Sequence, residues 1–449
     1  MLARARTLLP RQRRRPGEVD PLADGLPVTR FDGWRMTALA GFVVFCAAPG
    51  MTYGVAAFVD PFTQDLGMSR SLFALAYAMA TLFSAFVLLA AGKQIDRWGG
   101  RLTMAMSAVG LALGVLVLSS VHTTLAVFVG FGLIRTFGQG ILPLAARIII
   151  PFWFLRQRGR AFSLIGIAGT LSIATMPPLH EWLIGQIGWR QTWRLDALFL
   201  VVVVTPIILL FVRNRPEDVG QRPDGIVPAH PAVAVDHDEL PGLSLREAMR
   251  TSAFWGLVVI SAVGFGITSG LALNQVAIFE DLGYPGSLAA LTFTIESAAM
   301  FGVTILLGAI IDRVPLRWAM AFSQLVLLAA MLVLLNAHGF ALGALYAALR
   351  GTCMAILMLS LDVAWPSYFG RRHLGSIRGV GAAVGVFGTA LGPLPLGIAF
   401  DRLGSYAPAI VGMLALPAVA GALVAMARPP MIDDDMVPAD TVSVVTEFA

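Results

Sequence analysis

Two arginines and one glutamate lie deep inside long apolar runs of the sequence. Arg135 and Arg350 occupy matching positions 215 residues apart, and Glu296 lies in a separate run. A guanidinium group presents a planar fork of donors that fits a carboxylate or a phosphate. Two such groups facing one cavity predict a clamp for an anionic substrate. The alternative is that each arginine braces its own half of the chain through a pair between helices.

Glu296 is also a candidate proton carrier. Burial disfavours the charged form of a carboxyl group, so a buried glutamate is suited to binding and releasing a proton. The alternative is that Glu296 is a permanently paired counter-ion of Arg350 or of another cation.

Four uncharged polar side chains lie within the apolar runs as well. They are Tyr53, Gln139, Asn274 and Gln275. Such groups can orient a ligand, or they can simply bond between helices. His180, Glu181 and Asp196 fall near the expected outer ends of two runs. We expect solvated loop-end charges there, with an extracellular gate as the alternative.

A ten-residue loop motif, Gly-x-x-x-Asp-Arg-x-x-x-Arg, occurs twice in the chain. It begins at Gly92 and again at Gly308, an offset of 216 residues, which indicates a duplicated protein with two related halves. The charged members predict a latch that holds one conformation through charge pairs and helix-terminus dipoles. They are Asp96, Arg97, Arg101, Asp312, Arg313 and Arg317. The alternative is simple capping of the two loops.

Arg147 and Asp362 are a further matched pair, again 215 residues apart. Both lie near the expected cytoplasmic ends of their apolar runs. They can form a gate or act as partners of the two loops, and structural locking is favoured over substrate contact.

The elements that must position these residues are membrane helices. Of the 449 residues 57% are hydrophobic and 13% are charged, whereas a soluble domain has about a quarter charged residues. Twelve spans are expected, at 36–59, 71–95, 101–120, 124–153, 160–186, 191–213, 253–279, 287–311, 317–336, 340–367, 375–400 and 406–427. The predicted fold is an all-α membrane protein with twelve transmembrane helices in two pseudo-symmetric six-helix bundles.

Five segments follow from this division. We expect a disordered cytoplasmic arm over 1–35, an N-terminal bundle over 36–213, a cytoplasmic linker over 214–251, a C-terminal bundle over 252–427 and an acidic cytoplasmic tail over 428–449. The arm contains no segment that resembles a removable signal peptide. The linker is predicted to end in a short surface helix, capped by Ser244 with Glu247 three residues later.

The distribution of positive charge predicts the orientation. With the N-terminus inside and basic residues at the ends of the spans counted with the adjoining loops, 25 of the 32 lysines and arginines fall in cytoplasmic segments, 4 in outside loops and 3 within the spans. This bias places both termini in the cytoplasm.

Several function classes are disfavoured by what the sequence lacks. The two cysteines lie inside apolar runs, no Cys/His cluster has metal-ligand spacing and no Gly-rich phosphate loop carries a lysine. No nucleophile–base pair is recognisable. We therefore expect no enzyme, no metal, no cofactor, no ATP-driven pump and no nucleic-acid partner. The scarcity of lysine, with Lys93 alone, suggests a bacterial genome of high GC content.

The two copies of the loop motif resemble the cytoplasmic signature loop of the major facilitator superfamily. The stretch from Arg135 to Gly140, Arg-Thr-Phe-Gly-Gln-Gly, is similar to the superfamily's fourth-helix motif, whose arginine is linked to proton coupling. This resemblance implies alternating access around a central site and a functional monomer.

Further stretches resemble one branch, the monocarboxylate transporters and oxalate/formate antiporters of bacteria. They are Phe31-Asp-Gly-Trp34, Arg158-Gly-Arg-Ala161, Gly188-Trp-Arg190, Leu245 to Trp255, Tyr368 to Arg372 and Gly375-x-x-Arg378-Gly379. The branch implies transport of small organic anions by proton symport or anion exchange. Ala57 stands where the branch has a cation in helix one, and Met300 stands where it has an arginine four residues after the acid, Glu296.

The sequence thus predicts a secondary active transporter in a bacterial inner membrane. Its predicted cargo is a small mono- or dicarboxylate, coupled to protons or to a counter-anion. An efflux transporter for amphipathic compounds is the first alternative, because the spans are rich in Met and Phe. A membrane sensor that keeps the fold without turnover is the second alternative.

Overall fold

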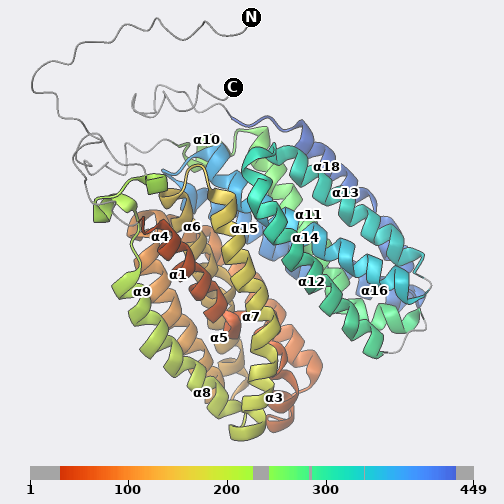
Figure 1. Cartoon of the computed structure of the whole chain (residues 1–449). Helices are drawn as coiled ribbons and strands as arrows, with labels where there is room; N and C mark the ends of the chain where they lie inside the picture. Colours follow the sequence, from red (N-terminus) through yellow and green to blue (C-terminus); the bar gives the residue numbers. More distant parts are fainter. Residues whose placement is uncertain (1–30, 226–241, 283–285, 338, 431–449) are drawn as a thin grey trace, which may run out of the picture.

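The computed structural model describes residues 31–225, 242–282, 286–337 and 339–430. Within these ranges the chain is helical, with one isolated bridge between Gly242 and Gly370 and no strand. The helices form two bundles that pack together at the upper end of Figure 1 and diverge toward the lower end. The prediction of an all-α protein in two bundles is confirmed for these ranges. Most of the predicted arm and tail lie outside the described residues.

The N-terminal bundle contains the elements up to residue 211. They are α1 (Gly33–Cys46), η1 (Ala48–Gly50), α2 (Thr52–Ala56), α3 (Val59–Asp65), α4 (Arg70–Ser119), α5 (Thr124–Ile134), η2 (Arg135–Ile141), α6 (Leu142–Trp153), α7 (Arg158–Ile187), α8 (Trp189–Phe199), η3 (Leu200–Val204) and α9 (Thr205–Phe211). A single core cluster runs through this bundle and centres on apolar side chains such as Phe62, Phe131 and Trp193.

The linker and the C-terminal bundle follow. Their elements are η4 (Pro216–Val219), η5 (Pro223–Gly225), α10 (Leu245–Ala248), α11 (Ser252–Asp281), α12 (Gly286–Ile310), η7 (Ile311–Arg313), α13 (Leu316–Leu335), α14 (Phe340–Phe369), α15 (Leu374–Leu391), α16 (Leu394–Leu403), α17 (Ala407–Met413) and α18 (Ala415–Met426). Two core clusters hold this bundle together.

Ten helices of the described chain are long and apolar enough to cross a membrane, so the predicted count of twelve is not reproduced. The expected spans 71–95 and 101–120 form one element, α4, which is kinked at Gly99 with φ 78° and ψ 163°. Glycine has no Cβ and adopts such a conformation without a steric cost. The motif loop between the two expected spans is therefore a kink inside a long helix.

The first expected span, 36–59, is broken. Helix α1 is followed by the short 3-10 turn Ala48–Gly50, which carries Pro49, and the chain resumes as α2 and α3. A proline removes one backbone donor from a helix, so the helix ends there. None of these three helices alone has the length of a membrane span.

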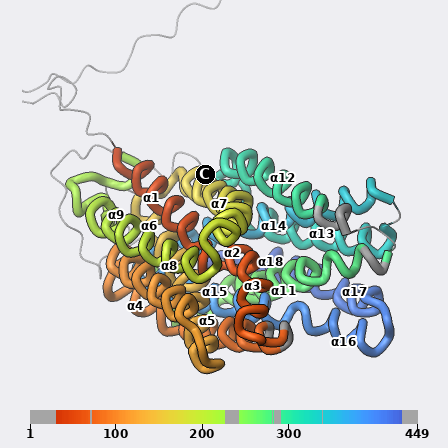
Figure 2. Tube along the Cα trace, turned by 90° about the horizontal axis from the view of Figure 1, so that it is seen from below, coloured from red at the N-terminus to blue at the C-terminus, as the bar shows by residue number. Residues whose placement is uncertain are grey.

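The two bundles meet through α4 with α15 and α7 with α12, and Figure 2 shows α7 lying next to α12. The contact between α4 and α15 is made by glycines. A Cβ added to Gly379 would lie 3.0 Å from the Gly92 Cα, and one added to Gly92 would lie 2.3 Å from the Gly375 carbonyl oxygen. Glycines four residues apart allow two helix backbones to approach closely.

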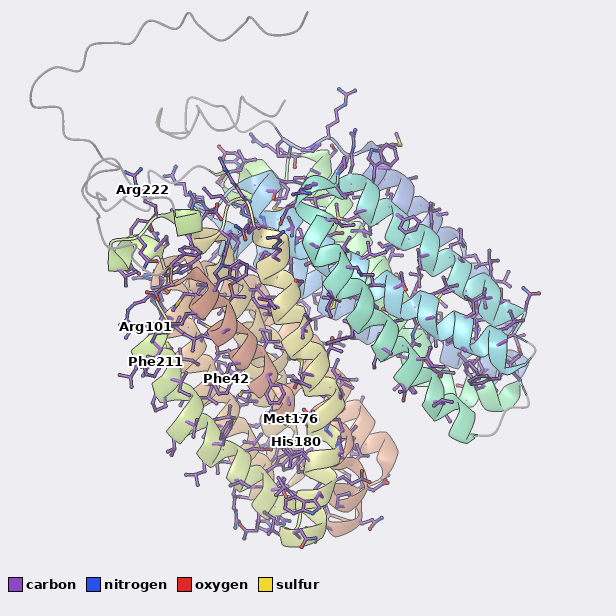
Figure 3. All side chains as sticks on the ribbon, in the orientation of Figure 1. Phe42, Arg101, Met176, His180, Phe211 and Arg222 are labelled. Carbon is purple, nitrogen blue, oxygen red and sulfur yellow. The ribbon has the colours of Figure 1, made fainter. Side chains whose placement is uncertain are left out.

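Large apolar side chains cover the outside of both bundles. Examples are Phe83, Phe86, Leu306, Leu423 and Met426, and Figure 3 shows side chains projecting all round the two bundles. An exterior of this kind is expected where lipid is the solvent.

The predicted capping of the linker helix is confirmed. The Ser244 backbone N–H donates to the Glu247 carboxylate at 2.8 Å, and the Glu247 N–H donates to the Ser244 hydroxyl at 3.3 Å. The first of these bonds lowers the pKa of Glu247 below its usual value. Helix α10 lies at the upper end of Figure 1, where the first described residues also meet the linker through Asp32 and Gln221.

Replacing Gly99 by alanine is expected to destabilise the protein by about 1–3 kcal/mol, because a Cβ strains the positive φ. The added atom would also lie 2.6 Å from the Asn214 side-chain nitrogen. The apparent melting temperature in detergent measures the effect.

The matched control is Gly185→Ala in α7, where nothing lies within 4 Å of an added Cβ. An equal melting temperature for Gly99→Ala and Gly185→Ala would contradict the role assigned to the kink.

Candidate functional site

A cavity of about 170 Å³ lies between the two bundles. Residues of α1, α2, α6 and α7 form one wall and residues of α12 and α14 form the other. The lining is mostly apolar and contains three methionines. It comprises Val44, Met51, Tyr53, Arg147, Phe162, Gly166, Gly169, Thr170, Ile173, Met300, Thr304, Ala355, Met358, Leu359 and Asp362. The charged residues of this lining are thus Arg147 and Asp362.

Arg135 lies outside this lining, at the break in the first helix. Its guanidinium donates from Nε to the Thr81 hydroxyl at 2.9 Å and from Nη1 to the Gly50 carbonyl at 3.1 Å, and it lies 4.5 Å from the centre of the Tyr77 ring. Gly138 makes room, since a Cβ there would lie 2.7 Å from the Gly50 Cα. Among the described residues the partners of Arg135 are all neutral.

The backbone around Arg135 is unusual. Residues Arg135–Ile141 form a π-helical stretch between α5 and α6. Such stretches are rare and occur often at functional sites. Arg135 therefore joins an irregular turn of one helix to the broken end of another.

Arg350 is held by a carboxylate. Its Nε donates to Glu296 Oε1 at 2.9 Å, its Nη2 bonds to Glu296 Oε2, and its Nη1 donates to the Tyr346 hydroxyl at 3.0 Å. This two-pronged contact joins α14 to α12. Glu296 is thus paired with Arg350 in this conformation, as the counter-ion interpretation predicted.

The predicted anion clamp is not assembled in this conformation. Arg135 and Arg350 are each 1% exposed, lie in different bundles and do not line the central cavity. The clamp stays a prediction that requires another conformation.

The four uncharged polar candidates lie in different surroundings. Tyr53 lines the cavity and donates to the Ser172 hydroxyl at 3.0 Å. Asn274 donates to a carbonyl of its own helix at 2.9 Å, and Gln275 is buried and donates to Thr292 at 2.5 Å. The Gln139 side-chain oxygen is buried without a hydrogen-bond partner among the described residues. Of the four, only Tyr53 lines the described cavity.

A cluster of three charges closes one end of the cavity. Asp362 of α14 bonds through Oδ2 to Arg147 of α6 and through Oδ1 to Arg378 of α15. The bond to Arg147 crosses between the bundles. Sequence analysis placed Arg378 at the start of the expected span 375–400 and counted its charge with the loop before it, so Arg378 was missed as a site residue.

Both motif aspartates bond to the other bundle through backbone amides. Asp96 of α4 accepts from the N–H groups of Gly375 and Ser376 at 2.7 Å each, where α15 begins. Asp312 accepts from the Gly159 N–H at 2.8 Å, where α7 begins. A carboxylate is stabilised at a helix N-terminus by the free amides and the helix dipole.

The motif arginines contribute less to these contacts. Arg101 bonds to the Leu209 carbonyl of its own bundle, and Arg317 lies over the Trp318 ring of its own helix at 5.5 Å. No ion pair is described for Arg97 or Arg313 within the described ranges. The cross-bundle bonds of the motif are thus made by its aspartates.

His180 corrects one expectation. It is fully buried, with its Nε2 3.3 Å from Asp196 Oδ2 and its ring edge-on to Phe58. The interpretation of His180 as a solvated loop-end residue is therefore wrong, because aromatic side chains of α2–α3 and α8 cover this end of the bundle. Figure 3 shows His180 and Met176 on the half of α7 remote from α10.

A second cavity of about 650 Å³ lies at the end near α10, lined by Arg156, Arg158, Asp312 and Arg317 among others. Within the described ranges, no three His, Cys, Asp or Glu side chains are grouped so that they could hold a metal ion.

The whole arrangement, two helical bundles around a central cavity with matched carboxylates on facing helix termini, is that of a membrane transport protein. The chain belongs to the Major Facilitator Superfamily, which it matches over residues 39–393.

Relatives with assigned transport roles align with parts of the chain. The probable L-galactonate transporter of Escherichia coli K12 is 26% identical over 252 residues, 53% of this chain and 51% of that protein. A multidrug resistance protein B homolog of Mycobacterium tuberculosis is 25% identical over 266 residues, 56% of this chain and 48% of that protein. The chain thus spans about half the length of these two.

The predicted branch is among the relatives. The oxalate:formate antiporter of Oxalobacter formigenes is 22% identical over 284 residues, 63% of this chain and 64% of that protein. The solved structure of the E. coli fucose:proton symporter has the same fold, with a TM-score of 0.66 at 15% identity over 88% of this chain and 98% of that one.

Glu296→Gln is expected to destabilise the protein by about 3–5 kcal/mol, because it leaves Arg350 buried without a counter-charge. The double variant Glu296→Gln/Arg350→Gln is expected to be more stable than the single one, since it removes both charges. Apparent melting temperatures of both variants in detergent test this. A single variant as stable as the unmodified protein would refute the pairing.

Proposed function

We propose that this protein is a secondary active transporter that moves a small organic anion by alternating access, coupled to protons or to a counter-anion. It lies in a bacterial inner membrane as a functional monomer with both termini cytoplasmic. Twelve spans are counted if the two limbs of α4 are taken separately and the broken segment α1–α3 is taken as the first span. The end near α10 is then the cytoplasmic one, and the structure is closed on that side.

The observation that carries the anion class is an excess of buried positive charge. Four arginines within the described spans, three of them buried and one partly buried, have two carboxylates among their bonding partners. The arginines are Arg135, Arg147, Arg350 and Arg378, and the carboxylates are Glu296 and Asp362. Burying an uncompensated charge is costly, so a transported anion that restores the balance binds favourably.

The size of the cavity supports a small cargo. Pockets for drug-sized ligands measure about 300–1,000 Å³, whereas this cavity measures about 170 Å³. The lining is apolar with hydroxyl groups from Tyr53, Thr170 and Thr304, which suits a short carboxylate with an apolar body.

Proton coupling is assigned to Glu296 in this proposal. Protonation of Glu296 removes the charge that holds Arg350, and the freed guanidinium then contributes to the anion clamp with Arg135. Asp96, Asp312 and their amide partners act as the cytoplasmic latch that opens when the bundles rock.

Efflux of amphipathic compounds is the second candidate, and the methionines of the cavity favour it. Met51, Met300 and Met358 line the space between the bundles, and methionine adapts readily to varied apolar ligands.

Reconstitution in proteoliposomes tests the proposal. Radiolabelled lactate, butyrate, oxalate and succinate are offered with an imposed pH gradient or with unlabelled anion inside. We expect saturable uptake of at least one carboxylate under one of these gradients. Transport of ethidium with no carboxylate uptake would replace the proposal by efflux, and carboxylate binding without uptake would replace it by a sensor.

Glu296→Gln is expected to abolish uptake driven by a pH gradient while leaving exchange of anion for anion, because the variant cannot carry the proton. Retained exchange of anion for anion would also show that the Glu296→Gln variant is folded. Retention of pH-driven uptake would exclude Glu296 as the proton carrier.

A further inference from the structure

The charge cluster that closes the central cavity is one negative charge short. Arg147 and Arg378 share the single carboxylate of Asp362, each taking one oxygen. The Nη1 atom of Arg378 is buried and has no hydrogen-bond partner among the described residues. Two guanidinium groups offer more donors than one carboxylate can accept.

Within the described ranges, no second carboxylate is bonded to Arg147 or Arg378. Asp96 is the first carboxylate to consider as a further partner, because it contacts the start of α15 just before Arg378. Its oxygens are already occupied by the Gly375 and Ser376 amides at 2.7 Å and the Ser376 hydroxyl at 2.5 Å. Glu296 is held by Arg350. The cluster therefore keeps a net charge of +1.

Arg147 is the member of the cluster that a solute can reach. Its side chain is 18% exposed and lines the central cavity, whereas the side chains of Asp362 and Arg378 are 8% and 7% exposed. Phe162 lines the same cavity and lies 5.5 Å from the Arg378 guanidinium. An anion that enters the cavity thus meets Arg147 first.

Arg147 is also the one member of the cluster that belongs to the N-terminal bundle. Asp362 and Arg378 lie on α14 and α15 of the C-terminal bundle, so their bond does not join the bundles. The bond between Arg147 and Asp362 does. Any group that takes Arg147 away from Asp362 removes one link across the closed end and leaves Asp362 paired with Arg378.

We propose that in this conformation, in which the clamp of Arg135 and Arg350 is not assembled, Arg147 is the anion subsite of the cavity and the carboxylate of the transported solute displaces Asp362 from it. This inference rests on the proposed function. Binding then exchanges a bond between bundles for a bond to the solute and brings the cluster to two positive and two negative charges. A ligand shifts a conformational equilibrium only by its differential affinity for the two states, and this exchange supplies that difference.

The net charge of +1 on the cluster also determines which class of solute the subsite favours. A monoanion neutralises the cluster. The second carboxylate of a dianion would lie among apolar side chains such as Met300 and Met358, because Arg147 is the cation of the described lining. The subsite therefore favours a monocarboxylate with a short apolar body over a dicarboxylate.

Binding of butyrate and of succinate to the purified protein in detergent, measured by titration calorimetry, tests the subsite. Arg147→Gln is expected to weaken butyrate binding by about 10- to 100-fold, the loss of one charge-assisted bond. Asp362→Asn is expected to tighten it several-fold, because the competitor for Arg147 is gone. If the bond between Arg147 and Asp362 serves only as a structural latch, both substitutions break the same bond. Butyrate affinity would then change in the same direction in both variants.

Arg147→Lys keeps the positive charge but lacks the planar pair of guanidinium donors. Its butyrate affinity is expected to lie between those of Arg147→Gln and the unmodified protein. This variant keeps the test decisive if Asp362→Asn does not fold. Unchanged butyrate affinity in Arg147→Gln, or succinate binding more tightly than butyrate, would overturn the subsite while leaving carboxylate transport intact. Absence of any carboxylate binding and uptake by the unmodified protein would instead refute the proposed function.

Discussion

The need to satisfy charged and polar groups away from water governs how the two bundles join. Each motif aspartate meets the free amides at the start of a helix in the opposite bundle, Asp96 on α15 and Asp312 on α7. These amides would otherwise lack partners at the helix ends. The same bonds satisfy both the carboxylates and the helix termini, so the closed end is a joint between bundles as well as a cap for each helix.

The repeat in the sequence predicted that Arg135 and Arg350 are equivalent, but it did not predict their partners. Arg135 and Arg350 match in position, yet neutral groups hold Arg135 and Glu296 holds Arg350. The duplicated halves have diverged in the neighbours supplied by other helices, and one sequence does not reveal which helices are neighbours. The two arginines are therefore equivalent in sequence position and different in the charge of their surroundings.

Other features were beyond the sequence for reasons of local physics. The amides that hold Asp96 and Asp312 belong to the backbone and leave no mark in residue types. The break at Ala48–Gly50 was hidden within an apolar run, although Pro49 marks it. Arg378 was missed because its partner Asp362 lies on another helix, α14, and that contact is a tertiary feature. His180 was assigned to solvent because the aromatic cover from other helices is a tertiary feature as well.

The glycine surface between α4 and α15 has a kinetic consequence. Where side chains interlock, separating two helices requires many rotamers to rearrange, and this adds to the activation barrier. At Gly92, Gly375 and Gly379 the two helices meet backbone to backbone, without interlocking side chains at that point. We therefore expect a low barrier from packing at these glycines, so that the polar bonds beside them weigh more in the rate at which the bundles part. Sequence changes that alter those bonds can then tune turnover without remodelling the packing.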